Sequence, residues 1–313
     1  MQIAPVTPAA RPNAFDTIIA SAAKIARPVV AVAAPLTRVA LEGALQAAQQ
    51  GLLVPVLVGP EQAIRDVARD AHFDLGGARI IDTADELSAA ATCAALCRTG
   101  EAAAIMKGSL HTDALMHAVL APEAGLRTTR RVSHVFVLDA PGYPRPLLVT
   151  DAAINIYPGL EEKVDIVKNA IDLAHAIGIA LPNVAILSAV ETVSPKIKST
   201  IDAAALCKMA ERRQIEGGVL DGPLAFDTAV SAEAAAIKGL TSAVAGAADI
   251  FVVPDLESGN MLVKQLEYLG GAELAGVVLG ARVPIILTSR ADSARARIAS
   301  CALATLYWHA IKR

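Results

Sequence analysis

The segment LTSRADSARARIAS, residues 287–300, places a serine and an arginine where a helix is expected to begin. Ser289 can cap this helix and Arg290 opens it, beside backbone N–H groups that have no partner within the helix. The helix dipole and a guanidinium group both favour an anion, so a phosphate would fit here. A plain N-cap with a solvated arginine, and with Asp292 as a first-turn charge, explains the same residues and is the commoner arrangement.

A second candidate lies in PDLESGNMLVKQLEYLGG, residues 254–271. Asn260 and Lys264 are four residues apart and therefore share one face of the expected helix. An amide and an ammonium group on one face could hold a carbonyl or phosphate oxygen. An ordinary amphipathic helix, with its leucines toward the core and Lys264 in water, accounts for the same pattern.

The segment MKGSLHT, residues 106–112, contains Lys107 and Thr112 after an expected strand. Lys107 precedes the glycine, whereas a Walker loop ends in Gly-Lys followed by Ser or Thr. The chain also contains no G-x-G-x-x-G run. We therefore expect neither a P-loop nucleotide site nor a Rossmann-type dinucleotide enzyme.

Two turns carry further polar candidates. In GLRTTRRVSHVF, residues 125–136, Arg131 lies close to Ser133, and guanidinium groups bind phosphate in a fork. In TDAAINIYPG, residues 150–159, Asp151 and Asn155 could orient a substrate or act as a base. A solvated basic turn and ordinary Asp and Asn turns are the plain alternatives.

The composition excludes several classes of partner. The chain has 28 Lys and Arg against 31 Asp and Glu, with 3% aromatic residues, so it offers little to a nucleic acid. The longest uncharged stretch, residues 173–190, is interrupted by His, Gly, Pro and Asn, and residues 1–15 lack the pattern of a signal peptide. The four scattered cysteines indicate neither a disulfide framework nor a metal site. We expect a cytoplasmic protein that binds no nucleic acid, membrane or metal.

Short β-branched runs, which alternate with helical patterns, must position these residues. Strands are expected at 28–34, 53–59, 102–108, 134–140, 146–152, 183–189, 217–223, 249–255, 276–281 and 283–289. The alternation predicts an α/β fold with a largely parallel sheet. Ligands of such sheets bind beyond the carboxyl ends of the strands, where polar residues of this chain concentrate.

Two pairs of expected strands are too close in sequence for a crossover helix: 134–140 with 146–152, and 276–281 with 283–289. Each pair is therefore expected to be antiparallel. If the chain leaves one domain near the first pair and returns near the second, residues 138–275 form a second α/β domain. This domain is inserted into a first domain of residues 1–137 and 276–313, and the cleft between them is the expected ligand site.

Taken in order, KGSLHT, RRVSHVF, TDAAINIYP, LDGPLAFDTAVS, PDLESGNMLVKQL and LTSRADSA resemble the motifs of the phosphate acetyltransferase and phosphate butyryltransferase family. The resemblance runs from about Arg27 to the C-terminus. It implies reversible transfer of an acetyl or short acyl group between coenzyme A and phosphate, by direct attack of the thiolate on an acyl phosphate. It also implies a fold similar to isocitrate and isopropylmalate dehydrogenases, with two domains around an interdomain cleft, usually as a homodimer. We therefore expect a homodimer or a higher homo-oligomer.

The same resemblance assigns roles to residues. Coenzyme A is a substrate, together with phosphate or acyl phosphate, and no cofactor is tightly bound. Ser289 would hydrogen-bond the reacting centre, and Arg290 would stabilise developing charge and phosphate. The substrate-binding side chains would come from the other motifs: Lys107, Thr112, Arg131, Ser133, Asp151, Asn155, Asn260 and Lys264.

One position departs from the family. The acetyltransferase branch has an aspartate, proposed as the base for the thiol, seven residues after the Ser-Arg pair, where this chain has Ala296. Asp292 is the nearest substitute. LTSRADSA is more similar to the butyryltransferase branch, so longer acyl groups are expected to be accepted.

Two other functions stay open. The missing aspartate would suit a non-catalytic acyl-CoA sensor, as in similar domains of some malic enzymes, although Ser289 and Arg290 are retained. A dehydrogenase on the related fold lacks support, because no arrangement of metal-binding aspartates is evident.

Overall fold

Buried β-branched runs form the strands of one mixed sheet in the computed structural model, which describes residues 13–287 and 292–312. The eleven strands found in these residues lie in the order β3 (Arg79–Asp82), β2 (Val54–Gly59), β1 (Val29–Ala33), β4 (Ala104–Lys107), β11 (Ile285–Ile286), β10 (Glu273–Leu279), β5 (Ser133–Asp139), β6 (Leu147–Thr150), β9 (Ile250–Val252), β7 (Asn183–Leu187) and β8 (Val219–Leu224). The chain therefore has an α/β fold with a large mixed sheet.

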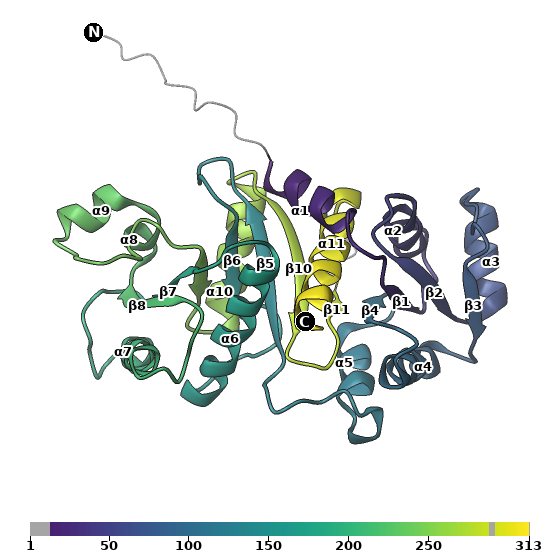
Figure 1. Ribbon diagram of the computed structural model, residues 1–313, viewed down its shortest axis with the longest axis horizontal. Helices are drawn as coiled ribbons and strands as arrows, with labels where there is room; N and C mark the ends of the chain where they lie inside the picture. The colour runs from purple at the N-terminus through teal and green to yellow at the C-terminus, as the bar shows by residue number, and fades with distance from the viewer. Residues whose placement is uncertain (1–12, 288–291, 313) are drawn as a thin grey trace, which may run out of the picture.

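Three antiparallel pairings interrupt an otherwise parallel sheet. The strands β5 and β6 pair antiparallel, as do β10 and β11, which confirms both pairs predicted from their short connections. β5 and β10 also pair antiparallel over their full length, with Ser133 opposite Leu279 and Asp139 opposite Glu273. These two strands lie at the centre of the molecule, between the two halves of the sheet (Figure 1).

The helices cover both faces of the sheet. One face carries α1 (Ala14–Ala22), α2 (Arg38–Gln49), α3 (Glu61–Asp70), α6 (Leu160–Ala176), α7 (Lys198–Glu211) and α11 (Ala294–Ile311). On the other face, α4 (Glu86–Thr99), α5 (Thr112–Leu120) and the 3-10 turn η1 (Pro122–Ala124) pack on the half that contains β1 to β4. The other half there carries α8 (Phe226–Val230) and α10 (Leu256–Tyr268), and α9 (Ala232–Ile237) follows α8.

The hydrophobic core is continuous on one face of the sheet and divided on the other. Because side chains alternate along a strand, Val30 and Val32 join one cluster while Ala31 and Ala33 join another. The first cluster runs across both halves of the sheet, from Phe15 on α1 to residues of α6 and β9. On the opposite face, the α4–α5 cluster and the α8–α10 cluster are separate. The space between them lies over the central strands.

The loop after β4 is fixed by a close approach of two backbones. The N–H of Gly108 donates to Ala33 O at 2.9 Å, and the N–H of Ser109 donates to Ala34 O at 2.9 Å. A Cβ at Gly108 would lie 2.2 Å from Ala33 O, so only glycine fits this position. The contact sets the direction in which the chain leaves β4 and enters α5.

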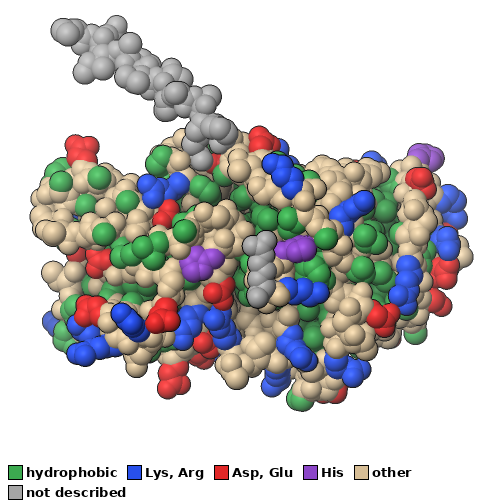
Figure 2. All heavy atoms as spheres, in the orientation of Figure 1, with side chains coloured by type: hydrophobic (Ala, Val, Ile, Leu, Met, Phe, Trp, Pro, Cys, Tyr) green, Lys and Arg blue, Asp and Glu red, His purple; other side chains and the backbone are tan. Residues whose placement is uncertain are grey.

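The surface carries both signs of charge. In Figure 2, Lys and Arg side chains are intermixed with Asp and Glu side chains on the visible face, as a net charge of −3 leads one to expect. None of the helices in the described ranges is long and apolar enough to cross a bilayer.

Candidate active site

A cleft of about 540 Å³ lies between the two separate core clusters. Its floor is formed by His134 and Phe136 of β5 and Leu274 of β10. One wall comes from the β4–α5 segment, and the opposite wall comes from α10 and Ala153. The remaining lining residues are Lys107, Leu110, His111, Thr112, Asp113, Asn260, Lys264, Leu287 and Asp292.

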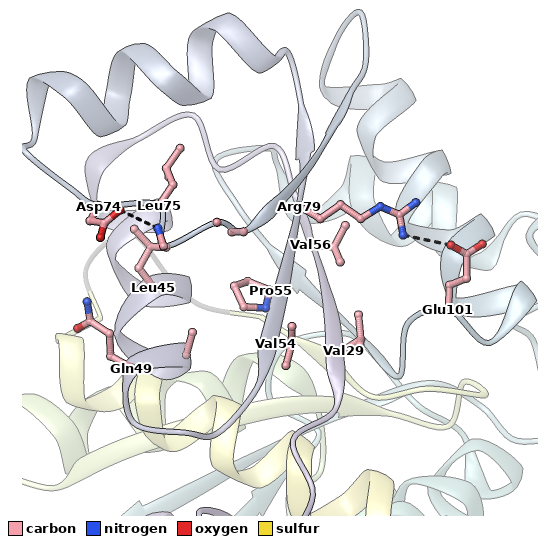
Figure 3. A pocket seen from close by; sticks show the side chains of 14 residues that line it. Val29, Leu45, Gln49, Val54, Pro55, Val56, Asp74, Leu75, Arg79 and Glu101 are labelled. Carbon is pink, nitrogen blue, oxygen red and sulfur yellow. Dashed lines mark hydrogen bonds and ion pairs between the residues drawn. The ribbon is translucent and has the colours of Figure 1, made fainter.

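A larger hollow of about 700 Å³ lies elsewhere, beside the amino ends of β1, β2 and β3 (Figure 3). Its floor is largely aliphatic, with Leu45, Val54 and Val56 among the labelled side chains. Its ion pair, Arg79 with Glu101, is exposed on both sides. We place the candidate site in the smaller cleft, because ligands of α/β sheets bind at the carboxyl ends of the strands, where polar groups converge.

Lys107 is the last residue of β4 and brings a buried ammonium group to the cleft. Its side chain is enclosed, with 8% of the residue exposed, and Nζ donates to the carbonyl oxygens of Gly108 at 3.4 Å and Leu110 at 3.3 Å. Thr112 follows as the first residue of α5 and lines the same cleft. Both predicted residues therefore face one cavity.

Asn260 and Lys264 lie on the facing wall. Asp255 caps α10 by accepting from the N–H of Ser258 at 2.8 Å, which fixes the start of the helix. Asn260 Nδ2 donates to Ala152 O at 3.3 Å, and Lys264 Nζ lies 2.8 Å from a carboxylate oxygen of Glu267. The four-residue spacing brings both side chains to the cleft, as expected of one helix face.

Asp151, Asn155 and Arg131 form a chain of hydrogen bonds behind the cleft. Asn155 Nδ2 donates to Asp151 Oδ2 at 2.6 Å, and Arg131 Nε donates to Asn155 Oδ1 at 2.8 Å. Asp151 Oδ1 also accepts from the N–H groups of Ala153 and Ile154. Burial raises the pKa of the Asp151 carboxyl, although these hydrogen bonds act in the opposite direction. The network shapes the loop that carries Ala153 to the cleft wall.

Ser133 lies on the other face of the sheet from the cleft. Its neighbour His134 lines the cleft, and successive side chains of a strand point to opposite faces. Ser133 Oγ is fully buried and accepts a 2.8 Å hydrogen bond from Asn169 Nδ2 on α6. The structure therefore does not bring Ser133 together with Lys107 and Lys264.

Ser289 and Arg290 lie outside the described residues. Leu287 and Asp292, on either side of this segment in the sequence, both line the cleft. Ala296, at the position of the family aspartate, lies in the first turn of α11, where its N–H donates to Ser293 Oγ at 3.1 Å.

The sequence interpretation missed the floor of the cleft. His134 and Phe136 alternate along one strand, so their shared face could have been recognised from the run HVFVL. Their rings pack edge to face, with centroids 4.2 Å apart. Burial lowers the pKa of His134 to about 3, so the imidazole is neutral at ordinary pH.

The described residues contain no group of three or more His, Cys, Asp or Glu side chains that could hold a metal ion. Burial raises the pKa of the Cys97, Cys207 and Cys301 thiols to about 12 and that of Cys93 well above its usual value. None of these thiols is suited to act as a nucleophile at neutral pH.

Comparison with known proteins identifies the family of the chain. Residues 83–305 match the family described as phosphate acetyl/butaryl transferase. The chain is 60% identical to a phosphate acetyltransferase of Rhizobium meliloti over 95% of this chain and 94% of that protein. It is 42% identical to a phosphate butyryltransferase of Clostridium acetobutylicum over 94% of this chain and 98% of the relative. The chain belongs to the phosphate acetyl/butyryl transferase family.

A solved structure agrees with this assignment. A branched-chain phosphotransacylase from Enterococcus faecalis V583 superposes with a TM-score of 0.79 at 30% identity, covering 90% of this chain and 99% of that one. These relatives are named as transferases, which gives no support to the non-catalytic sensor.

Proposed function

We propose that the cleft catalyses reversible transfer of an acetyl or short-chain acyl group between coenzyme A and phosphate. The observation that carries this is the convergence of Lys107 and Lys264, from opposite walls, above an apolar floor of Phe136 and Leu274. Two ammonium groups suit a phosphoryl group, and the floor suits a short acyl chain. Membership of the transferase family supports the same reaction. The protein is an acyl-CoA:phosphate acyltransferase.

The chemistry requires a thiolate, a stabilised oxyanion and a bound phosphate. A thiol with a pKa near 8.5 must lose its proton, and the thiolate then attacks the carbonyl carbon of the acyl phosphate directly. Lys107 and Lys264 would hold the phosphate, with Thr112 and Asn260 completing its hydrogen bonds. Coenzyme A enters as a substrate, and no tightly bound cofactor is required.

We assign Ser289 and Arg290 the roles implied by the family, with Ser289 at the reacting centre and Arg290 on the developing charge. Leu287 and Asp292 in the cleft wall support this assignment. Asp292 is also our candidate for the base that replaces the family aspartate. Arg131, Asp151 and Asn155 would act by holding the cleft loop, whereas the position of Ser133 gives no support for direct substrate contact.

We further propose two domains, residues 1–137 with 276–313 and residues 138–275, similar in arrangement to isocitrate and isopropylmalate dehydrogenases. The divided core on the cleft face supports this boundary, and β5 and β10 would be shared between the domains. We also propose that the protein works in the cytoplasm, which the four free cysteines support.

The protein is expected to form a homodimer through the outer face of α10. Met261 and Tyr268 are exposed on this helix, and Leu269, which directly follows its last residue, is 82% exposed. Ile156 and Tyr157 are also exposed and adjoin it, because Tyr157 donates to Glu257 at 2.6 Å. An apolar stripe of this kind is typical of a surface that a partner covers.

A direct assay tests the function. The protein is mixed with coenzyme A and acyl phosphates of about two to five carbons, a range that a short acyl pocket would accept, and thioester absorbance is followed. We expect thioester to form, with the rate depending on chain length. If no thioester forms while acetyl-CoA still binds, the sensor is the correct function.

A further inference from the structure

His134 is a buried polar residue in the floor of the cleft. Only 2% of the residue is exposed, and the imidazole packs against Phe136 on the same face of β5. Gly276, which pairs with Phe136 across the β5–β10 ladder, makes room for the ring. A Cβ at Gly276 would lie 2.5 Å from Cε1 and 2.6 Å from Nε2 of His134. The missing side chain of Gly276 is therefore what allows an imidazole here.

The imidazole has no hydrogen-bond partner in the described part of the chain. Nδ1 is buried and unpaired, whereas buried polar groups in proteins are nearly always satisfied. Burial also keeps the ring uncharged. A neutral imidazole has one N–H donor and one acceptor nitrogen, so this residue has an unused donor at a site that excludes water. Among the described residues, the titratable groups that share the cleft with it are Lys107, His111, Asp113, Lys264 and Asp292.

We propose that His134 is a catalytic residue whose neutral N–H donates a hydrogen bond to the acyl carbonyl oxygen and stabilises the oxyanion of the tetrahedral intermediate. This assignment rests on the proposed function. The bound acyl group supplies the acceptor that the protein lacks at this position. A donor held rigidly in an apolar floor stabilises developing charge more strongly than a solvated one, because it needs no reorganisation.

His134 keeps its proton throughout the step. The coenzyme A thiolate forms a bond to the carbonyl carbon, and the C=O π electrons move to oxygen, which accepts the hydrogen bond. The C=O bond then re-forms as the C–O bond to phosphate breaks. The thiol proton leaves before attack, and the departing phosphate takes up one proton, so the overall reaction conserves protons.

His134→Phe removes the donor and keeps a ring against Phe136. We expect kcat to fall by on the order of a hundredfold, with KM for both substrates changed far less, as when an oxyanion donor is removed. His134→Gln has a side-chain amide that can donate, so its kcat is expected to be about tenfold higher than that of His134→Phe. The control is His309→Phe on α11, where the partly exposed imidazole contacts Ala26 O outside the cleft, and its turnover should match wild type.

Infrared spectra of bound acetyl-CoA with a labelled carbonyl give a readout that a structural role would not move. The C=O stretch should lie at lower frequency in wild type than in His134→Phe, because a hydrogen bond weakens the double bond. Equal turnover and an equal stretch in a folded His134→Phe variant overturn this assignment alone. A wild-type protein that forms no thioester overturns the proposed function, and this assignment with it.

Discussion

Substitution of Arg290 tests whether its guanidinium group belongs to the active site or is solvated at the start of a helix. If it contacts phosphate and developing negative charge, Arg290→Ala should lower turnover by on the order of a hundredfold, or roughly 2.7 to 4 kcal/mol of transition-state stabilisation. Arg290→Lys should recover only part of the loss, because an ammonium group cannot form the planar fork. Steady-state kinetics with both substrates varied measure this. Near-normal kcat and KM in the alanine variant would remove Arg290 from the mechanism.

The candidate site was predictable from the sequence where a motif follows the end of a strand or lies on one helix face. Lys107 and Thr112 fall at the junction of β4 and α5, and Asn260 and Lys264 share a helix face, so position in the element determined their direction. Ser133 and His134 show where prediction of the site from the sequence fails. A one-residue difference along a strand moves a side chain to the other face of the sheet, and a family motif does not state which face holds the substrate.

At the scale of the secondary-structure element, the close contact between the β4 loop and β1 predicts a specific sensitivity. Gly108→Ala should destabilise the fold by about 1–3 kcal/mol, because the added Cβ meets the carbonyl oxygens of Ala33 and Ala34. The neighbouring Lys107 should shift as well, so activity should fall. Gly142→Ala is the matched control, since no atom beyond its own chain neighbours lies within 4 Å of its Cβ position, and its unfolding free energy should change by less than about 0.5 kcal/mol. Urea unfolding curves compare the two variants, and equal stability would contradict the argument.

The helices α6 and α7 are joined by a buried ion pair. Lys163 Nζ lies 2.9 Å from Asp202 Oδ2, and both side chains are buried, whereas Lys198, 2.7 Å from the same oxygen, is 74% exposed. Asp202→Ala leaves a buried ammonium group unpaired and should cost about 3–5 kcal/mol of unfolding free energy. Lys198→Ala, the control, should cost less than about 1 kcal/mol. Equal losses in urea unfolding would show that burial does not decide the effect.

The same pair gives the stability a pH dependence. Burial raises the pKa of Asp202, but hydrogen bonds from Lys198 and Lys163 outweigh it, and the pKa is lowered overall. A lowered carboxyl pKa contributes stability above the unfolded value of about 3.9, and this contribution is lost as the pH falls through the folded pKa. The difference in stability between wild type and Asp202→Ala should therefore shrink in acid below that value. A difference that stays constant to the lowest pH at which the protein folds would contradict this.

At the scale of the whole molecule, most strands were predictable because each is a buried apolar run between helical patterns. β3 was missed, since Arg79–Asp82 is a short edge strand that is partly exposed along its length and has no continuous apolar run. The order of the strands in the sheet could not be predicted from the sequence pattern. Pairings such as β4 with β11 join residues far apart in the chain, and short-range periodicity contains no information about them.

The exposed apolar face of α10 leads us to predict that the protein dimerises through this helix. The wild-type protein should sediment as a dimer, and the double variant Met261→Glu, Leu269→Glu should shift toward monomer, because charge is costly in a buried apolar interface. Ile237→Glu on α9 is the control, as this side chain is equally exposed but lies outside the stripe. Analytical ultracentrifugation at several concentrations measures the oligomeric state of the wild type and of both variants. A double variant that remains dimeric would place the interface elsewhere.

The antiparallel pairing of β5 with β10 places both ends of residues 138–275 beside each other. Leu138 is opposite Leu274, and Asp139 is opposite Glu273, so the segment leaves and re-enters these two strands at one place in the sheet. Neighbouring antiparallel strands can be closed by a turn of about two residues. The segment therefore begins and ends at one place in the sheet, and a change in the length of its loops leaves the pairing of β5 with β10 in register, while its strands and core remain continuous with the other half of the sheet.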